Sequence, residues 1–272
     1  MYVAEVDTDG TRWAAARTER GRGFGAVATD YAAWRPGYPP EAVAFLAGGD
    51  EGHAVARRIL DVGAGTGLLS APLVAQGHEV VAADTSADML AELAQRLPGV
   101  RTLVAGAEAL PLPDGAFDVV VAAQAAHWFD RVRAGREFRR VLRPGGAVGF
   151  GWNTRVDRAP WLVELAGLLA ADSRDQQGDL DEGNSAVVRA FADVLDAEVA
   201  QLEVPWVQQV HPDGVVGRVA SSSHVGRLED RERDAYLGRV RDLLSEHPDT
   251  RDRDRLDLPY LTSVWRLILR AP

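Results

Sequence analysis

The stretch Arg58-Ile59-Leu60-Asp61-Val62-Gly63-Ala64-Gly65-Thr66-Gly67 decides the fold of this chain. It is a short apolar run that ends in a glycine loop, and residues 68–76 after it have helical composition. Glycines let the backbone turn tightly and approach a ligand closely, while the following helix offers free N–H groups. The stretch therefore predicts a strand, a ligand-binding turn and a helix.

The glycine spacing argues against a nicotinamide cofactor. A dinucleotide fingerprint needs its third glycine one position later, where this chain has Leu68. A glycine loop taken alone is also compatible with a turn that binds no nucleotide. A second position in the sequence is needed to distinguish a nucleotide-binding loop from a simple turn.

That second position is Asp84, which ends the apolar run 79–84 one strand-helix unit later. A carboxylate at the end of this strand can accept both hydroxyl groups of a ribose. The alternative is that Asp84 caps the helix that begins near Ser86. In the first interpretation the two positions together place an adenosine.

Apolar runs and helical segments alternate through the rest of the chain. Strands are expected at residues 58–62, 79–84, 100–104, 117–123, 147–152, 198–210 and 255–269. Helices are expected at residues 68–76, 87–97, 133–142 and 161–171, with a loop at 172–184 and helical material at 212–247. The pattern predicts an α/β fold, a Rossmann-like, seven-stranded, mostly parallel, doubly wound sheet. N-terminal helices and a helical insertion before the last strand would form a lid.

Composition limits the partners. The chain has 272 residues, a formal net charge of −10, a pI of about 5.1 and no cysteine. The negative charge disfavours nucleic acid, and the sequence contains no apolar run of membrane-spanning length. A cytoplasmic protein acting on a small molecule is expected, as a monomer or homodimer. The histidines lack zinc-ligand spacing, so no metal site is predicted.

Five strings together resemble the class I S-adenosylmethionine-dependent methyltransferases, in the small-molecule branch of trans-aconitate and menaquinone/ubiquinone-type enzymes. They are Asp61–Gly67, Ala83-Asp84, Ala107–Asp114, Phe117–Val120 and Leu142–Gly146. Weaker similarity continues through Trp152-Asn153, Ser221–Ser223 and Leu258–Tyr260. One departure is Gly106, where many relatives have an acidic residue. The resemblance implies S-adenosyl-L-methionine as cofactor, with S-adenosyl-L-homocysteine as product.

The resemblance also implies binding roles residue by residue. The methionine moiety would contact Asp61 and the backbone of Gly63, Ala64 and Gly65, with Gln124 beneath it; the ribose would contact Asp84; the adenine would contact Thr85, Met89, Ala107 and Glu108. Tyr31 and Arg35 would reach the methionine carboxylate, the arginine by bidentate hydrogen bonds. For these last two the alternative is a local turn in which Arg35 packs on Trp34.

Two histidines are candidate catalytic bases for an acceptor that must lose a proton. His127 follows the fourth strand at the carboxyl edge of the sheet, and His224 lies in the helical insertion. The alternatives are a packing or cofactor-facing role for His127 and a surface-loop role for His224. Methyl transfer itself mainly requires alignment of the acceptor and exclusion of water.

The predicted organisation is a flexible arm at residues 1–22 and a single methyltransferase domain at residues 23–272. That domain would comprise a helical cap (23–57), a cofactor-binding core (58–155) and a substrate and lid region (156–272). Two other functions remain open at this point. The cofactor site could serve a non-methylating reaction such as cyclisation, or the chain could be a non-catalytic binding module.

Overall fold

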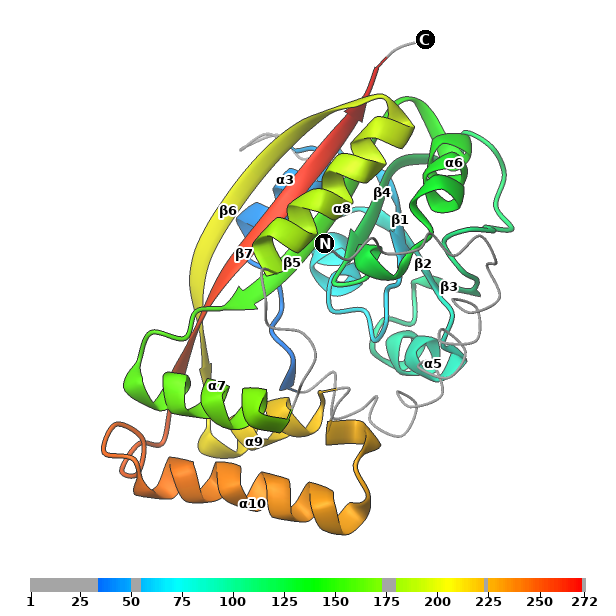
Figure 1. Ribbon diagram of the computed structural model, residues 1–272. Helices are drawn as coiled ribbons and strands as arrows, with labels where there is room; N and C mark the ends of the chain where they lie inside the picture. The colour runs from blue at the N-terminus through cyan, green and yellow to red at the C-terminus, as the bar shows by residue number, and fades with distance from the viewer. Residues whose placement is uncertain (1–33, 50–54, 173–179, 223–224, 271–272) are drawn as a thin grey trace, which may run out of the picture.

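The computed structural model describes residues 34–49, 55–172, 180–222 and 225–270. A seven-stranded sheet with the order β3-β2-β1-β4-β5-β7-β6 runs through the molecule (Figure 1). Its strands are β1 (Arg58–Val62), β2 (Glu79–Asp84), β3 (Arg101–Val104), β4 (Phe117–Ala123), β5 (Leu142–Arg155), β6 (Ala197–Val210) and β7 (Leu256–Leu269). The predicted α/β class and seven-stranded sheet are confirmed. The predicted arm at 1–22 lies outside the described residues.

The sheet changes direction at one strand. Neighbouring strands among β1 to β5 pair in parallel, whereas β7 pairs antiparallel with both β5 and β6. The carboxyl ends of β1, β2, β4 and β5 therefore lie at one edge of the sheet. In a parallel sheet, ligands bind beyond this edge.

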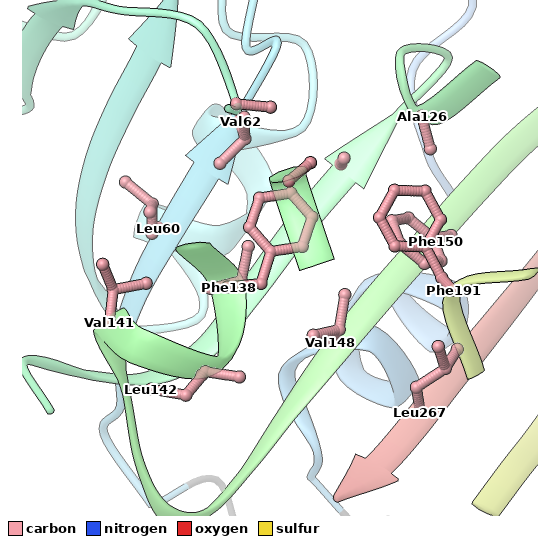
Figure 2. Close-up of a cluster of buried hydrophobic side chains, with 14 of the residues drawn as sticks. Leu60, Val62, Ala126, Phe138, Val141, Leu142, Val148, Phe150, Phe191 and Leu267 are labelled. Atoms are coloured by element: carbon pink, nitrogen blue, oxygen red, sulfur yellow. The ribbon is translucent and has the colours of Figure 1, made fainter. Parts of the chain in front are cut away.

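Two apolar clusters fill the two faces of the sheet. On one face, helices α6 (Arg131–Val141) and α8 (Leu180–Leu195) cover a cluster that contains Phe138, Phe150 and Phe191 (Figure 2). On the other face lie α3 (Pro40–Ala47), α4 (Ser70–Ala75) and α5 (Ala87–Arg96). Residues 119–122 of β4 are all buried, with Val120 and Ala122 in one cluster and Val119 and Val121 in the other, which explains the apolar run at these positions.

A third cluster lies beyond the carboxyl edge. The long strands β5, β6 and β7 extend past the rest of the sheet toward α7 (Pro160–Asp172), α9 (Pro212–Ala220) and α10 (Asp230–Glu246) (Figure 1). The three helices, with the short 3₁₀ helix η3 (Val225–Arg227), surround buried side chains such as Leu162, Val219 and Val240. We call these helices the distal layer. The predicted helical material at 212–247 is confirmed.

Two sequence-based assignments were wrong. Residues 143–146 were expected to end the preceding helix, but β5 begins at Leu142 and includes them. A loop was expected at residues 172–184, of which 173–179 lie outside the described residues; α7 includes Asp172, and α8 begins at Leu180 and includes Gly183. The helix is stabilised by tertiary burial, since Val187, Val188 and Phe191 pack into the core. Within the described residues, no helix is long and apolar enough to span a membrane.

Candidate functional site

The glycine loop joins the ends of three strands. The backbone N–H groups of Gly63 and Ala64 both donate to the carbonyl of Ala83 at the end of β2, at 2.8 and 3.1 Å. Gly63 has a φ of 71°, and a Cβ added there would lie 2.5 Å from the Cβ of Ala125, just after β4. Only glycine fits at this position, because both its backbone angle and its contact exclude a side chain.

Asp84 is fixed by two backbone donors. Its Oδ2 accepts from the Gly65 N–H and its Oδ1 from the Ser86 N–H, each at 2.8 Å. Burial raises the pKa of Asp84, while the hydrogen bonds from Ser86 and Gly65 lower it in part. The helix α5 is capped by a different residue, Ser86, whose Oγ accepts from the Met89 N–H. The carboxylate is therefore held against the glycine loop and has further lone pairs to offer.

Asp61, which was predicted to contact the methionine moiety, is almost completely buried. It is 1% exposed, and its Oδ2 accepts a 2.7 Å hydrogen bond from the Ser70 hydroxyl. Burial raises its pKa to about 7; the Ser70 hydrogen bond opposes this rise, and the nearby Asp84 adds to it. Asp61 thus lies behind the loop and anchors α4 to β1.

Thr66 lies in the glycine loop and was not among the predicted site residues. Its hydroxyl oxygen is buried and has no hydrogen-bond partner in the structure, although the residue is only 1% exposed. A buried hydroxyl without a partner is costly, so it marks a place where a ligand can contribute a hydrogen bond. Its position between Gly65 and Gly67 is the signal that could have identified it.

Thr85 and Glu108 lie together beside Gly106. A Cβ added to Gly106 would lie 3.1 Å from Glu108 Oε2 and 3.8 Å from Thr85 Cγ2. The other carboxylate oxygen of Glu108 accepts from the Asp130 N–H at 2.9 Å, which connects this loop to the start of α6. Ala107 and Met89 are buried, so a ligand would meet the backbone of Ala107 rather than its side chain. The structure thus places Thr85 and Glu108, two of the four residues predicted for the adenine, beside the same glycine.

Gln124 follows β4 in a left-handed conformation, with a φ of 55°. Its N–H donates to the carbonyl of Gly151 at 2.8 Å, and its Nε2 donates to the carbonyl of Asn153 at 3.0 Å. Few residues other than glycine adopt such a φ, so surrounding contacts must hold it. These two bonds tie Gln124 to β5.

His127 lies in the 3₁₀ helix η2 (Ala126–Trp128), next to the loop. The Trp152 Nε1–H donates to His127 Nδ1 at 3.4 Å. His127 is an exposed residue by its surface area, but the protein atoms around its ring partly desolvate it and lower its pKa to about 4. Tryptophan can only donate, so the neutral imidazole carries its proton on Nε2. In this arrangement His127 offers a hydrogen-bond donor rather than a free lone pair.

The glycine loop is open at Gly65. A Cβ added to Gly65 would meet nothing within 4 Å, so the backbone there is open to a ligand. Thr66, whose hydroxyl is buried, follows Gly65 in the chain, and the Asp84 carboxylate accepts a hydrogen bond from the Gly65 N–H. Both residues therefore lie next to this open position. Among the described residues, no group of acidic and histidine side chains could hold a metal ion.

Comparison with known proteins identifies the family. A family model described as a methyltransferase domain matches residues 60–150. An uncharacterised methyltransferase of Mycobacterium tuberculosis is 38% identical over 253 residues, which cover 93% of this chain and 98% of the relative. The chain belongs to the class I S-adenosylmethionine-dependent methyltransferases. It is a methyltransferase.

Two further relatives of this methyltransferase cover most of the chain. The malonyl-(acyl-carrier protein) O-methyltransferase of Halorhodospira halophila is 34% identical over 226 residues, covering 79% of this chain and 68% of the relative. A solved structure of a candidate type II methyltransferase from Anaeromyxobacter dehalogenans has a TM-score of 0.64 and 25% identity, and covers 88% of this chain and 99% of its own.

In this methyltransferase, the N-terminal segment 34–38 contacts the distal layer. The Arg35 Nη2 donates to the carbonyl of Ser221 at the end of α9, at 2.9 Å. Trp34 lies across α9, since Cβ atoms added to Gly214 and Gly217 would lie 3.2 and 2.5 Å from its ring. The sequence analysis missed this contact. Arg35 therefore contacts the distal layer, while the predicted Tyr31 and His224 lie outside the described residues.

Proposed function

We propose that this methyltransferase transfers a methyl group from S-adenosylmethionine to an oxygen atom of a small organic acceptor. The choice of methyl donor rests on the Asp84 carboxylate, which backbone N–H groups of Gly65 and Ser86 hold beside an open glycine loop. A fixed carboxylate at the end of β2 is suited to the two hydroxyl groups of a ribose.

The remaining binding roles follow the arrangement of the loop. The backbone of Gly63, Ala64 and Gly65 would hold the methionine moiety, with Gln124 below it and Asp61 supporting the loop from behind. Thr85, Met89, Ala107 and Glu108 would border the adenine. The bound sulfonium would supply a methyl carbon that is already activated, so the protein mainly aligns the acceptor and excludes water.

The distal layer is positioned to exclude that water. Its helices connect to the ends of β5 and β6 and to the beginning of β7, at the same edge of the sheet as the glycine loop. Arg35 and Trp34 attach its helix α9 to the segment that precedes α3. We therefore assign the distal layer as the lid over the acceptor. His224 stays a candidate base within this region.

His127 would orient the acceptor instead of deprotonating it. Its Nδ1 accepts from Trp152 and its pKa is lowered to about 4, so at neutral pH it presents only the Nε2–H. A carboxylate acceptor needs no base, because a free carboxyl group is already ionised at neutral pH. The O-methyltransferase of malonyl-(acyl-carrier protein) among the relatives supports oxygen as the methylated atom. An acceptor carboxylate could accept the hydrogen bond of His127.

Calorimetry and product detection test the proposal. Isothermal titration of the folded protein with S-adenosylhomocysteine should give saturable binding at one site, and no binding would overturn the proposal. Incubation with S-adenosylmethionine and a panel of small carboxylic acids should release S-adenosylhomocysteine together with a methyl ester. Turnover of an acceptor without release of S-adenosylhomocysteine would instead support a non-methylating reaction such as cyclisation. A panel of matched alcohols and amines serves as the control for oxygen and carboxylate selectivity.

A further inference from the structure

Asn153, near the end of β5, joins three parts of the molecule. Its side-chain Nδ2 donates to the carbonyl of Gly37 at 2.9 Å, and its Oδ1 accepts from the Thr262 hydroxyl at 2.5 Å. Its backbone carbonyl accepts from Gln124 Nε2 at 3.0 Å. One residue thus connects the N-terminal segment, β7 and the turn after β4.

The hydrogen bonds continue in one direction into β6. The Trp206 Nε1–H donates to the Thr262 hydroxyl oxygen at 2.7 Å, and the Thr262 hydroxyl in turn donates to Asn153 Oδ1. Thr262 is fully buried. Because the Trp206 indole can only donate, the Thr262 hydroxyl accepts from it and directs its own proton to Asn153 Oδ1. This fixes the orientation of the Asn153 amide, whose Nδ2 then donates to Gly37.

Gly37 connects this chain to the distal layer. It lies two residues after Arg35, which donates to Ser221, and three after Trp34, which packs against Gly217. The segment 34–37 is therefore attached at one end to α9 and at the other end to Asn153. A displacement of α9 would pull on the side chain of Asn153.

Gln124 is the group on which this displacement would act. Its left-handed φ of 55° is unfavourable for a residue with a side chain, so its conformation depends on its two bonds to β5. One of these bonds ends on the Asn153 carbonyl. Movement of the β5 backbone at Asn153 would release it.

We propose that Asn153 is a positioning residue that sets Gln124 beneath the methyl donor and couples this placement to the lid. The side chain acts through the backbone, because it anchors β5 to Gly37 and Thr262 and so fixes the carbonyl that receives Gln124. This inference rests on the proposed function, since it assumes that Gln124 faces the donor. A closed lid and a correctly placed Gln124 then occur together.

The test is isothermal titration of the full chain with S-adenosylhomocysteine, together with thermal melting. Asn153→Ala should raise the dissociation constant about tenfold. Asn153→Asp keeps the shape and the acceptor for Thr262 but removes the donor to Gly37, and should raise it about threefold. Thr262→Val removes the bond to Asn153 with little change of shape, and should also raise it about threefold.

Thr250→Val is the matched control. Thr250 is 1% exposed, and its hydroxyl donates to the carbonyls of Leu244 and His247, at the turn that follows α10. This turn includes neither α9 nor the segment 34–37, through which the lid would act on Asn153. This variant should lower the melting temperature as Thr262→Val does but leave the affinity unchanged. Equal affinities for both threonine variants would overturn the inference, even if Asn153→Ala does not fold.

A double variant separates positioning from general destabilisation. If Asn153 acts through Gln124, Gln124→Ala combined with Asn153→Asp should bind S-adenosylhomocysteine no more weakly than Gln124→Ala alone. Additive losses would show that Asn153 acts by another route and would overturn the inference. Failure of the wild-type protein to bind would overturn the proposed function instead, so the two failures can be told apart.

Discussion

The part of the molecule that carries the glycine loop, β1 to β4 with α4 to α6, is called the donor half here because the methyl donor is predicted to bind there. It and the distal layer are held together by contacts that differ in sequence separation. In the donor half, the main bonds join the ends of successive strands, such as Gly65 to Asp84, which lie 19 positions apart. In the distal layer, the attachment of Arg35 to Ser221 spans 186 positions. The bond of Thr262 to Asn153, between the strands β7 and β5 that lead to this layer, spans 109. The first half depends on a rigid local turn, whereas the second depends on segments that meet only in the folded chain.

The comparison suggests that the two parts respond differently to change. Substitutions in the glycine loop should affect stability and donor binding together, because the same backbone does both. Substitutions in the distal layer should affect the local opening of its helices first. Four variants examine this difference.

The largest effect is expected for Gly63→Ala. A Cβ there would lie 2.5 Å from Ala125 Cβ at a φ of 71°, so both overpacking and backbone strain oppose it. Together these should cost about 3 to 5 kcal/mol of unfolding free energy. Denaturant titration measures this loss. Gly77→Ala is the control, since Gly77 has a φ of 87° but open space around it, and strain alone should cost about 1 to 2 kcal/mol. Equal losses would mean that the contact with Ala125 is unimportant.

Asp84→Asn should mainly reduce donor binding. The amide cannot accept from both Gly65 and Ser86 while also receiving ribose hydroxyls, so affinity for S-adenosylhomocysteine should fall about 10- to 100-fold, or about 1.5 to 3 kcal/mol. Asp118→Asn is the matched control. Asp118 also accepts a backbone N–H, from Arg58, but it lies at the beginning of β4 on the opposite edge. Its variant should lose stability and keep its affinity in calorimetry.

Gly217→Ala should loosen the distal layer. A Cβ there would lie 2.5 Å from Trp34, so the indole must leave α9, at a cost of about 1 to 3 kcal/mol. Hydrogen exchange should become faster in α9 and stay unchanged in β1 and β2. Gly238→Ala in α10 has open space, and should stabilise its helix by up to about 1 kcal/mol. Faster exchange throughout the sheet would contradict the separation of the two parts.

The same difference in range explains what the sequence could predict. Strands β1 to β4 were placed nearly to the residue, because apolar runs, the glycine loop and Asp84 follow one another closely in the chain. Strand β5 was predicted too short, at 147–152, since its extension at both ends depends on pairing with distant strands. The long strands β6 and β7 were also located, from their β-favouring composition. The start of α8 was missed, since Gly183 and nearby acidic residues conceal a helix that tertiary burial stabilises.

Side-chain pairs distant in sequence were the least predictable. Asp84, Thr85 and Glu108 were predicted as site residues; the structure places Asp84 against the glycine loop, and Thr85 and Glu108 beside Gly106. Arg35 was expected near a ligand carboxylate, and nothing in its local sequence indicates the carbonyl of Ser221. The contact of Trp34 with Gly217 likewise requires the fold. The binding roles of all these residues stay predictions, as do a cytoplasmic location and a monomer or homodimer.

The smallest expected effect is the contribution of His127 to the pH dependence of folding stability. Its size reports how far water is excluded from the imidazole, which lies between the two parts. Burial lowers the pKa of His127 from 6.5 to about 4, so between these pH values the unfolded chain binds more protons than the folded one. Its contribution to stability is therefore complete above pH 6.5 and is lost as the pH falls toward 4. Since part of the residue is exposed, we expect a loss of only about 1 kcal/mol.

His127→Asn isolates this contribution. Asp61 has a pKa raised to about 7 and so favours folding at low pH, with the opposite sign. Because Asp61 is present in both proteins, its contribution cancels when the two stability profiles are subtracted. The wild-type protein should lose about 1 kcal/mol more than the variant between pH 6.5 and 4 in denaturant titrations. Parallel profiles would mean that His127 is well solvated, and would return it to consideration as a base.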